Sequence, residues 1–264
     1  MIAVVFSGYA FGVLAVCAAM LVSVVGLALV QRLVSSELRK QHNDVAGFIY
    51  AVIGIVYAVL LALVVVAVWE DYEAARETTD REASELAEIF WLAHQFPEPH
   101  QRQIQELTRS YARVVVKEEW SLMAEGRSSP RAWALLDEMR GVIGGFEPRT
   151  EAGQVLYQEG LNRIHDLADA RRMRLVEASE GIPTILWVVL GVGGIVTVGF
   201  TYLFGLENTW AHRLMVAALA GLITLVLLTI GALEYPFSDG ARIGPGAFEL
   251  ILNRFETSKL SDLR

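Results

Sequence analysis

One stretch of the sequence, residues 43–95, constrains the fold more than any other. Its first part, Val45–Val68, carries no charge and is long enough for a helix that crosses a membrane. The charged segment that follows has no Gly or Pro before Pro97, so nothing interrupts the helix at the membrane boundary. At about 1.5 Å per residue, the stretch predicts one helix of roughly 75 Å, half in lipid and half in water.

One face of this predicted helix can be followed across the boundary in steps of three or four residues. The face is small and apolar in the membrane and acidic just outside it, and its members are Gly47, Ala51, Ile55, Val59, Leu63, Val66, Glu70, Glu73, Glu77 and Asp80. A single helix cannot enclose a conduction path with such a face. Several copies around an axis would form a narrow hydrophobic constriction that opens into an acidic vestibule, and this arrangement is our main functional prediction.

Two simpler interpretations of the same helix stay open. Neighbouring helices could pack against its small residues. These small residues are Gly47, Ala51, Gly54, Ala58 and Ala62. The acidic residues could pair with Arg76 and Arg81 or simply face water, as charged residues on helices commonly do.

Three more uncharged runs are long enough to cross a membrane, at residues 4–30, 182–206 and 214–233. With 54% hydrophobic residues and a mean hydropathy of +0.41, the chain is too apolar for a soluble globular domain. The first run lacks the basic start of a secretory signal, and the segment Leu14–Cys17 resembles a lipoprotein cleavage site only faintly. The first run is therefore predicted to be a membrane span.

The segment between the second and third spans is predicted to be helical throughout. Apolar residues recur with a period near 3.6 from Gln103 to Met123, and helix start signals occur at Ser129 and Thr150. Residues 69–181 contain 14 basic and 22 acidic residues, so their net charge is 14 − 22 = −8. This balance argues against nucleic-acid binding, which needs clustered Lys and Arg. The acidic residues outside the traced face are interpreted as a solvated face.

These observations predict an all-α protein in which a cytoplasmic helical bundle is inserted between the second and third of four transmembrane helices. The predicted parts are residues 1–68 with the first two spans, 69–181 with the soluble bundle, 182–233 with the last two spans, and 234–264 as a C-terminal tail. Four spans place both termini and the bundle on one side of the membrane. The bias of Lys and Arg favours the cytoplasmic side.

The spans contain no group suited to catalysis or proton coupling. No Asp, Glu, Lys, Arg or His lies within the four runs, whereas pumps and proton-coupled transporters bury such groups. The chain has no P-loop, HExxH or GxSxG motif, and its single cysteine, Cys17, allows no disulfide within one chain. We therefore expect no enzyme activity, no cofactor and no metal site, and a passive pore needs none of these.

Four segments of the chain resemble the bestrophin-like family of bacterial membrane proteins. They are residues His42–Tyr50, Val68–Glu73, Gly199–Asn208 and Leu233–Phe237, and the resemblance extends over nearly the whole chain. It implies a multi-pass protein of the bacterial inner membrane. It also implies a remoter similarity to bestrophins, which are pentameric ion channels. The expected partners are then the lipid bilayer, further copies of this chain and inorganic ions.

Two local matches extend the resemblance to bestrophins themselves. Trp69–Glu73 resembles the Trp-x-x-Tyr-Glu that follows the bestrophin pore helix, and Pro236-Phe237 resembles the Pro-Phe after the last bestrophin span. The first match places the pore neck at Ala51, Ile55 and Val59. The pore mouth and vestibule are expected at Asn43, Asp44, Gly47, Leu63, Val66, Glu70, Glu73, Glu77 and Asp80.

Some bestrophin features are absent from this sequence. The bestrophin neck aromatics are missing, and the segment Ser238–Arg242 lacks the acidic run of the bestrophin calcium clasp, so calcium activation is not expected. Many bestrophins pass anions, but the acidic residues beyond the neck favour cations here. Two functions stay open: a homo-oligomeric ion channel, or a non-conducting membrane scaffold or sensor that binds a protein partner through its acidic helical domain.

Overall fold

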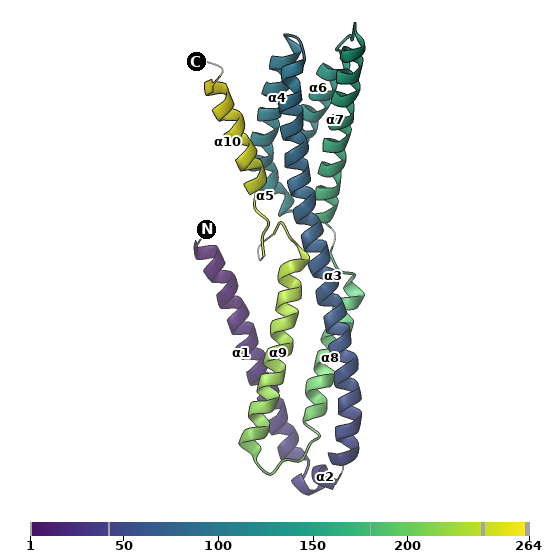
Figure 1. Ribbon diagram of the computed structural model, residues 1–264. Helices are drawn as coiled ribbons and strands as arrows, with labels where there is room; N and C mark the ends of the chain where they lie inside the picture. Colours follow the sequence, from purple (N-terminus) through teal and green to yellow (C-terminus); the bar gives the residue numbers. More distant parts are fainter. Residues whose placement is uncertain (1, 42, 180, 239–240, 262–264) are drawn as a thin grey trace. The chain divides into compact units, whose positions relative to one another are not determined.

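The computed structural model describes residues 2–41, 43–179, 181–238 and 241–261, and within these ranges the chain is helical with no strand (Figure 1). Four helices are long and apolar enough to cross a membrane. The prediction of an all-α protein with four transmembrane helices is therefore confirmed. His42 and residues 239–240, which lie in segments singled out above, are outside the described residues.

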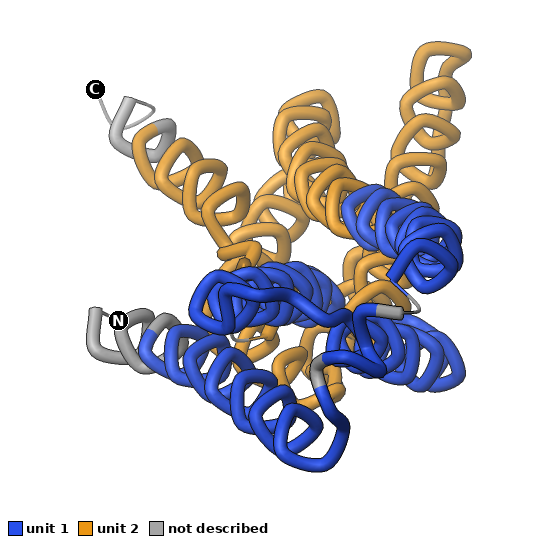
Figure 2. The backbone as a smooth tube through the Cα atoms, turned by 90° about the horizontal axis from the view of Figure 1, so that it is seen from below, with its two compact units in different colours: residues 1–70, 181–234 blue, residues 71–180, 235–264 orange. Residues whose placement is uncertain are grey.

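The chain divides into two compact units, which are coloured separately in Figure 2. Unit 1 comprises residues 1–70 and 181–234 and holds three of the candidate spans and the first part of the other, Asn43–Gln95. Its helices are α1 (Ile2–Leu33), α2 (Ser36–Gln41), the first part of α3 (Asn43–Leu92), α8 (Thr184–Thr201) and α9 (Thr209–Glu234). The short α2 lies between α1 and α3 and carries Arg39 and Lys40 in its last turn. The 50-residue α3 confirms the long unbroken helix, because it ends only shortly before Pro97.

Unit 2 comprises residues 71–180 and 235–264. Besides the second part of α3 it contains the 3₁₀ turn η1 (Ala93–Gln95), α4 (His100–Val114), the π-helical turn η2 (Val115–Glu119), α5 (Trp120–Met123), α6 (Pro130–Gly144), α7 (Glu151–Glu177) and α10 (Gly246–Ser261). The predicted helix starts are confirmed, because the Ser129 hydroxyl accepts a bond from the Ala132 amide and the Thr150 hydroxyl accepts one from the Gly153 amide.

The C-terminal segment, interpreted above as a tail, packs within unit 2. Its aromatic residues Phe237, Phe248 and Phe255 are buried, and the Phe255 ring stacks on Phe90 of α3 with ring centroids 4.1 Å apart. The indole nitrogen of Trp120 donates to the Ile243 carbonyl at 3.0 Å. Burial of Phe248 and Phe255 stabilises the position of α10.

Candidate functional site

Within unit 1, α3 has one packed side and one uncovered side. The packed side carries Tyr57, Val64 and Val68, and the Tyr57 hydroxyl donates to the Leu190 carbonyl of α8 at 2.9 Å. The uncovered side carries the predicted neck: Ala51 is exposed, Ile55 is 65% exposed and Val59 is 53% exposed. Such apolar exposure requires lipid, a neighbouring copy or a pore lumen to cover it.

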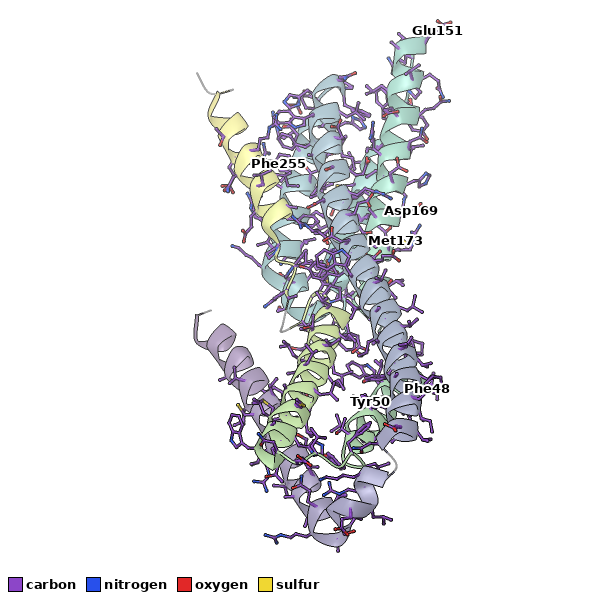
Figure 3. The ribbon with its side chains drawn as sticks, turned by 60° about the horizontal axis from the view of Figure 1, so that its bottom comes forward. Phe48, Tyr50, Glu151, Asp169, Met173 and Phe255 are labelled. Atoms are coloured by element: carbon purple, nitrogen blue, oxygen red, sulfur yellow. The ribbon has the colours of Figure 1, made fainter. Side chains whose placement is uncertain are left out.

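The remaining apolar members of the predicted face lie on the same uncovered side. Leu63 and Val66 are exposed, and Gly47 is half-buried near the Phe204 ring. Figure 3 shows Phe48 directed away from unit 1, whereas the neighbouring Tyr50 stacks on Phe200 of α8. The uncovered side of α3 is wider than the predicted face. One part of it can therefore contact lipid while another part contacts a neighbouring copy or lines a pore.

The small-residue band of α3 has few contacts with other helices of the same chain. Ala51, Ala58 and Ala62 are exposed, and a Cβ added at Gly54 would meet nothing within 4 Å among the described residues. At Gly47, at the start of the band, an added Cβ would lie 3.9 Å from the Phe204 ring. The alternative of packing within one chain therefore loses support, and packing against another copy remains open.

The acidic part of the face is exposed along α3. Glu77 pairs with Arg81 at 2.9 Å, as the simpler interpretation suggested, and both side chains are mostly exposed. Within the described ranges, Glu70, Glu73 and Asp80 have no ion pair within 4.0 Å. Their carboxylates are thus exposed and not neutralised by a neighbouring side chain of the described residues.

At the start of α3, Asn43 has a structural role that sequence reasoning missed. Its amide nitrogen donates to the Gly205 carbonyl and its amide oxygen accepts from the Gly205 amide, both at 3.0 Å. The Arg39 guanidinium donates to the Phe204 carbonyl at 3.2 Å. These bonds join the two loops of unit 1, whereas Asp44 is exposed. We call Arg39, Asn43 and Gly205 the loop clasp.

We predict that Gly205→Ala destabilises the protein by about 1–3 kcal/mol, because the added methyl overpacks the loop clasp. A Cβ at Gly205 would lie 2.7 Å from the Lys40 backbone nitrogen, and backbone cannot move aside as a flexible side chain can. Thermal unfolding of the purified protein measures the effect. Gly199→Ala is the matched control, since its Cβ would meet nothing within 4 Å in the described structure and alanine favours the helix. Equal melting temperatures for the two variants would contradict the prediction.

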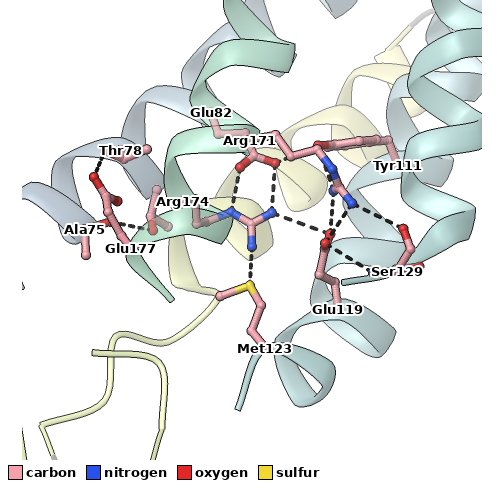
Figure 4. A network of polar contacts seen from close by, with 11 residues as sticks. Ala75, Thr78, Glu82, Tyr111, Glu119, Met123, Ser129, Arg171, Arg174 and Glu177 are labelled. Carbon is pink, nitrogen blue, oxygen red and sulfur yellow. Dashed lines mark hydrogen bonds and ion pairs between the residues drawn. The ribbon is translucent and has the colours of Figure 1, made fainter. Parts of the chain in front are cut away.

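Unit 2 contains a buried network of charges that the sequence analysis did not predict (Figure 4). Arg174 binds Glu82 through Nε at 2.6 Å and Nη2 at 3.0 Å, and Arg171 binds Glu119 through Nη1 at 2.5 Å and Nη2 at 2.7 Å. All four side chains are fully buried. The interpretation of the remaining acidic residues as a solvated face is therefore wrong for Glu82 and Glu119.

Helical spacing explains how these charges reach the interior. On α7, Ile164 and Leu167 are followed at steps of four and three by Arg171 and Arg174, so the arginines continue the apolar face. On α3, Glu82 follows the buried Thr79 by three residues and precedes the buried Leu86 by four. A charged residue that continues the apolar face of a helix was thus the signal in the sequence that these side chains are buried.

Tyr111 completes the network. Its hydroxyl donates to Glu82 at 2.7 Å and accepts from Arg171 Nη1 at 3.2 Å. Burial, reinforced by the Glu82 charge, raises the pKa of Tyr111 well above its usual value. Burial alone would lower the pKa of Arg174, but the Glu82 carboxylate outweighs it and raises that pKa. The network therefore contains neutral Tyr111 and charged arginines at physiological pH.

The fold defines an α-helical integral membrane protein, and comparison with known proteins identifies its family. A family model described as the Bestrophin-like domain matches residues 17–248, so the chain belongs to the bestrophin-like family. No curated protein matches the chain. Within the described residues no group of His, Cys, Asp or Glu could hold a metal ion.

Solved structures of a bacterial bestrophin homologue from Klebsiella pneumoniae share the fold. One, determined by zinc phasing, has 16% sequence identity and a TM-score of 0.67, and the match covers 90% of this chain and 96% of that one. A substituted variant of the homologue has 13% identity and a TM-score of 0.70, with 92% and 98% covered. At such identities the likeness establishes the fold alone.

Proposed function

We propose that this protein is a homo-oligomeric ion channel, a pentamer as in bestrophins, with α3 lining the conduction path. The observation that carries the proposal is the uncovered side of α3, where exposed apolar residues are followed by four exposed carboxylates; of these, Glu70, Glu73 and Asp80 have no ion pair among the described residues. The four uncharged runs, residues 4–30, 45–68, 182–206 and 214–233, contain no charged side chain that could guide an ion within one chain. A path between several copies avoids this difficulty.

In the proposed channel, Ala51, Ile55 and Val59 form the neck and Glu70, Glu73, Glu77 and Asp80 line the vestibule on the cytoplasmic side. Membership of the bestrophin-like family supports the placement. A narrow hydrophobic neck can gate by dewetting, and rings of carboxylates concentrate cations. We therefore propose a cation preference, with the termini and unit 2 in the cytoplasm and the spans in the bacterial inner membrane.

The proposal is tested by ion flux through purified protein in liposomes. We expect flux that requires an oligomer, and Ile55→Ser should raise it severalfold because a polar side chain keeps the neck hydrated. Val56→Ser is the matched control, since Val56 is equally exposed but lies about 100° around the helix.

Two results would contradict the channel. The first is a protein that is monomeric at all concentrations in nanodiscs. The second is an oligomer without flux, which would favour the scaffold or sensor. Equal effects of the Ile55 and Val56 substitutions would instead show that the neck has been placed on the wrong residues.

A further inference from the structure

A small basic pocket lies on unit 2, and none of its lining residues belongs to the predicted conduction path. It has a volume of about 230 Å³ and is lined by Ser110, Arg113, Val114, Lys117, Glu118 and Arg131. Ser110, Arg113 and Lys117 follow one another on one face of α4 and η2, and Arg131 is the second residue of α6. Three cations against one carboxylate give the lining residues a charge of +2, and two more carboxylates, Glu106 and Glu256, lie 3.8 Å from Arg113.

Two of the pocket's donors, the Lys117 ammonium and the Ser110 hydroxyl, have no partner among the described residues, and Arg113 has only distant ones. Among the described residues, Lys117 has no ion pair or side-chain hydrogen bond, and neither has the Ser110 hydroxyl. The carboxylates nearest to Arg113, those of Glu106 and Glu256, are both 3.8 Å away, which is too far for a hydrogen bond. Only Arg131 has a close partner, Glu118 at 2.9 Å.

A π-helical turn, η2, forms part of the pocket's lining. An extra residue in the turn shifts the helical register, and such turns are frequent at functional sites. Within η2, Glu119 is buried and bound to Arg171, while Lys117 is exposed in the pocket. The positive end of α6 adds to the potential near Arg131.

We propose that this pocket binds a phosphate group. A phosphate monoester carries about −1.5 to −2 charges at pH 7, which matches the pocket's charge of +2. Arginine forks bind phosphate oxygens in pairs, and lysine supplies a point charge. Pockets for drug-sized ligands occupy about 300–1,000 Å³, so this smaller one suits a phosphate with a short substituent. The source is a free phosphate compound or a phosphorylated lipid headgroup.

Binding of inorganic phosphate to the full-length protein in detergent tests the proposal, by calorimetry at constant ionic strength. We expect saturable binding of one phosphate per chain, weakened at least about tenfold by Lys117→Ala and by Arg113→Ala, since one charge-assisted hydrogen bond contributes about 1.5–3 kcal/mol. Arg102→Ala is the matched control, because Arg102 is an exposed cation on α4 that does not line the pocket. It should change the affinity less than about twofold.

Absence of saturable binding in the wild type would overturn the proposal, and so would equal weakening by Arg102→Ala, which would indicate general attraction to charge. Glycerol phosphate, a mimic of a lipid headgroup, forms a second arm. Tighter binding than inorganic phosphate would indicate a phosphate monoester such as a lipid headgroup, and weaker binding would indicate inorganic phosphate itself. The readout is binding rather than flux, so its outcome is independent of the proposed channel.

Discussion

Replacing Arg174 with Met is expected to destabilise the protein by about 3–5 kcal/mol, because it leaves the buried Glu82 carboxylate without its partner. Arg174 and Glu82 are fully buried, so no water can solvate the remaining charge. The Tyr111 hydroxyl would still donate to Glu82, but one neutral donor cannot replace a guanidinium that makes two bonds. For a chain of this size we expect the melting temperature to fall by roughly 6–20 °C.

Two comparisons show whether the buried pair is the cause. Arg81→Met removes the partner of Glu77 on the exposed side of α3, the helix that carries Glu82. It should lower the free energy of unfolding by less than about 1 kcal/mol. Adding Glu82→Gln to Arg174→Met removes the uncompensated charge, so the double variant should be more stable than Arg174→Met alone. A double variant as unstable as the sum of the two single variants would contradict the prediction.

The same network fixes how α3 is rotated within unit 2. Glu82 lies five residues after Glu77, which places it about 140° around the helix from the exposed acidic face. The ion pair with Arg174 therefore holds one side of α3 against α7 and leaves Glu73, Glu77 and Asp80 on the other side. Buried ion pairs contribute little net stability, but they can specify one arrangement, and we infer that role here.

The sequence was sufficient to predict the features set by local physics. Helix α3 follows from a run without breakers, and the starts of α6 and α7 follow from the capping residues Ser129 and Thr150. The four spans follow from uncharged runs of membrane length. Each of these depends on residues close together in the chain.

Features that depend on partners far apart in the chain were beyond sequence reasoning. Asn43 and Gly205 form two hydrogen bonds across 162 residues, and Glu82 meets Arg174 across 92. Neither spacing follows from helical periodicity. The same holds for α10, whose Phe255 stacks on Phe90, and for Lys117 and Arg131 in the basic pocket. Of the predicted site, the uncovered side of α3 is seen, while its role as a pore lining depends on copies that one chain does not contain.

The acidic face leads to the second large effect: neutralising Glu70 and Glu73 together should reduce cation selectivity severalfold. In a symmetric assembly each residue forms a ring, so the two substitutions remove two charges from every copy. These residues are chosen because they are exposed and have no ion pair within 4.0 Å in the described part of the chain, whereas Glu77 is paired with Arg81. A ring of free carboxylates raises the local cation concentration and repels anions.

The measurement is the reversal potential of purified channels in a salt gradient, for the wild type and for Glu70→Gln with Glu73→Gln. The wild type should prefer cations, and the double variant should move toward zero selectivity. Asp71→Asn with Glu151→Gln is the control, because it removes the same number of exposed charges away from the predicted face. The difference in selectivity between the wild type and the Glu70→Gln, Glu73→Gln variant should also become smaller as the salt concentration rises. The reason is that the screening length falls from about 30 Å at 0.01 M to about 8 Å at 0.15 M. A chloride preference that is unchanged in the double variant would show that the acidic face does not line the conduction path.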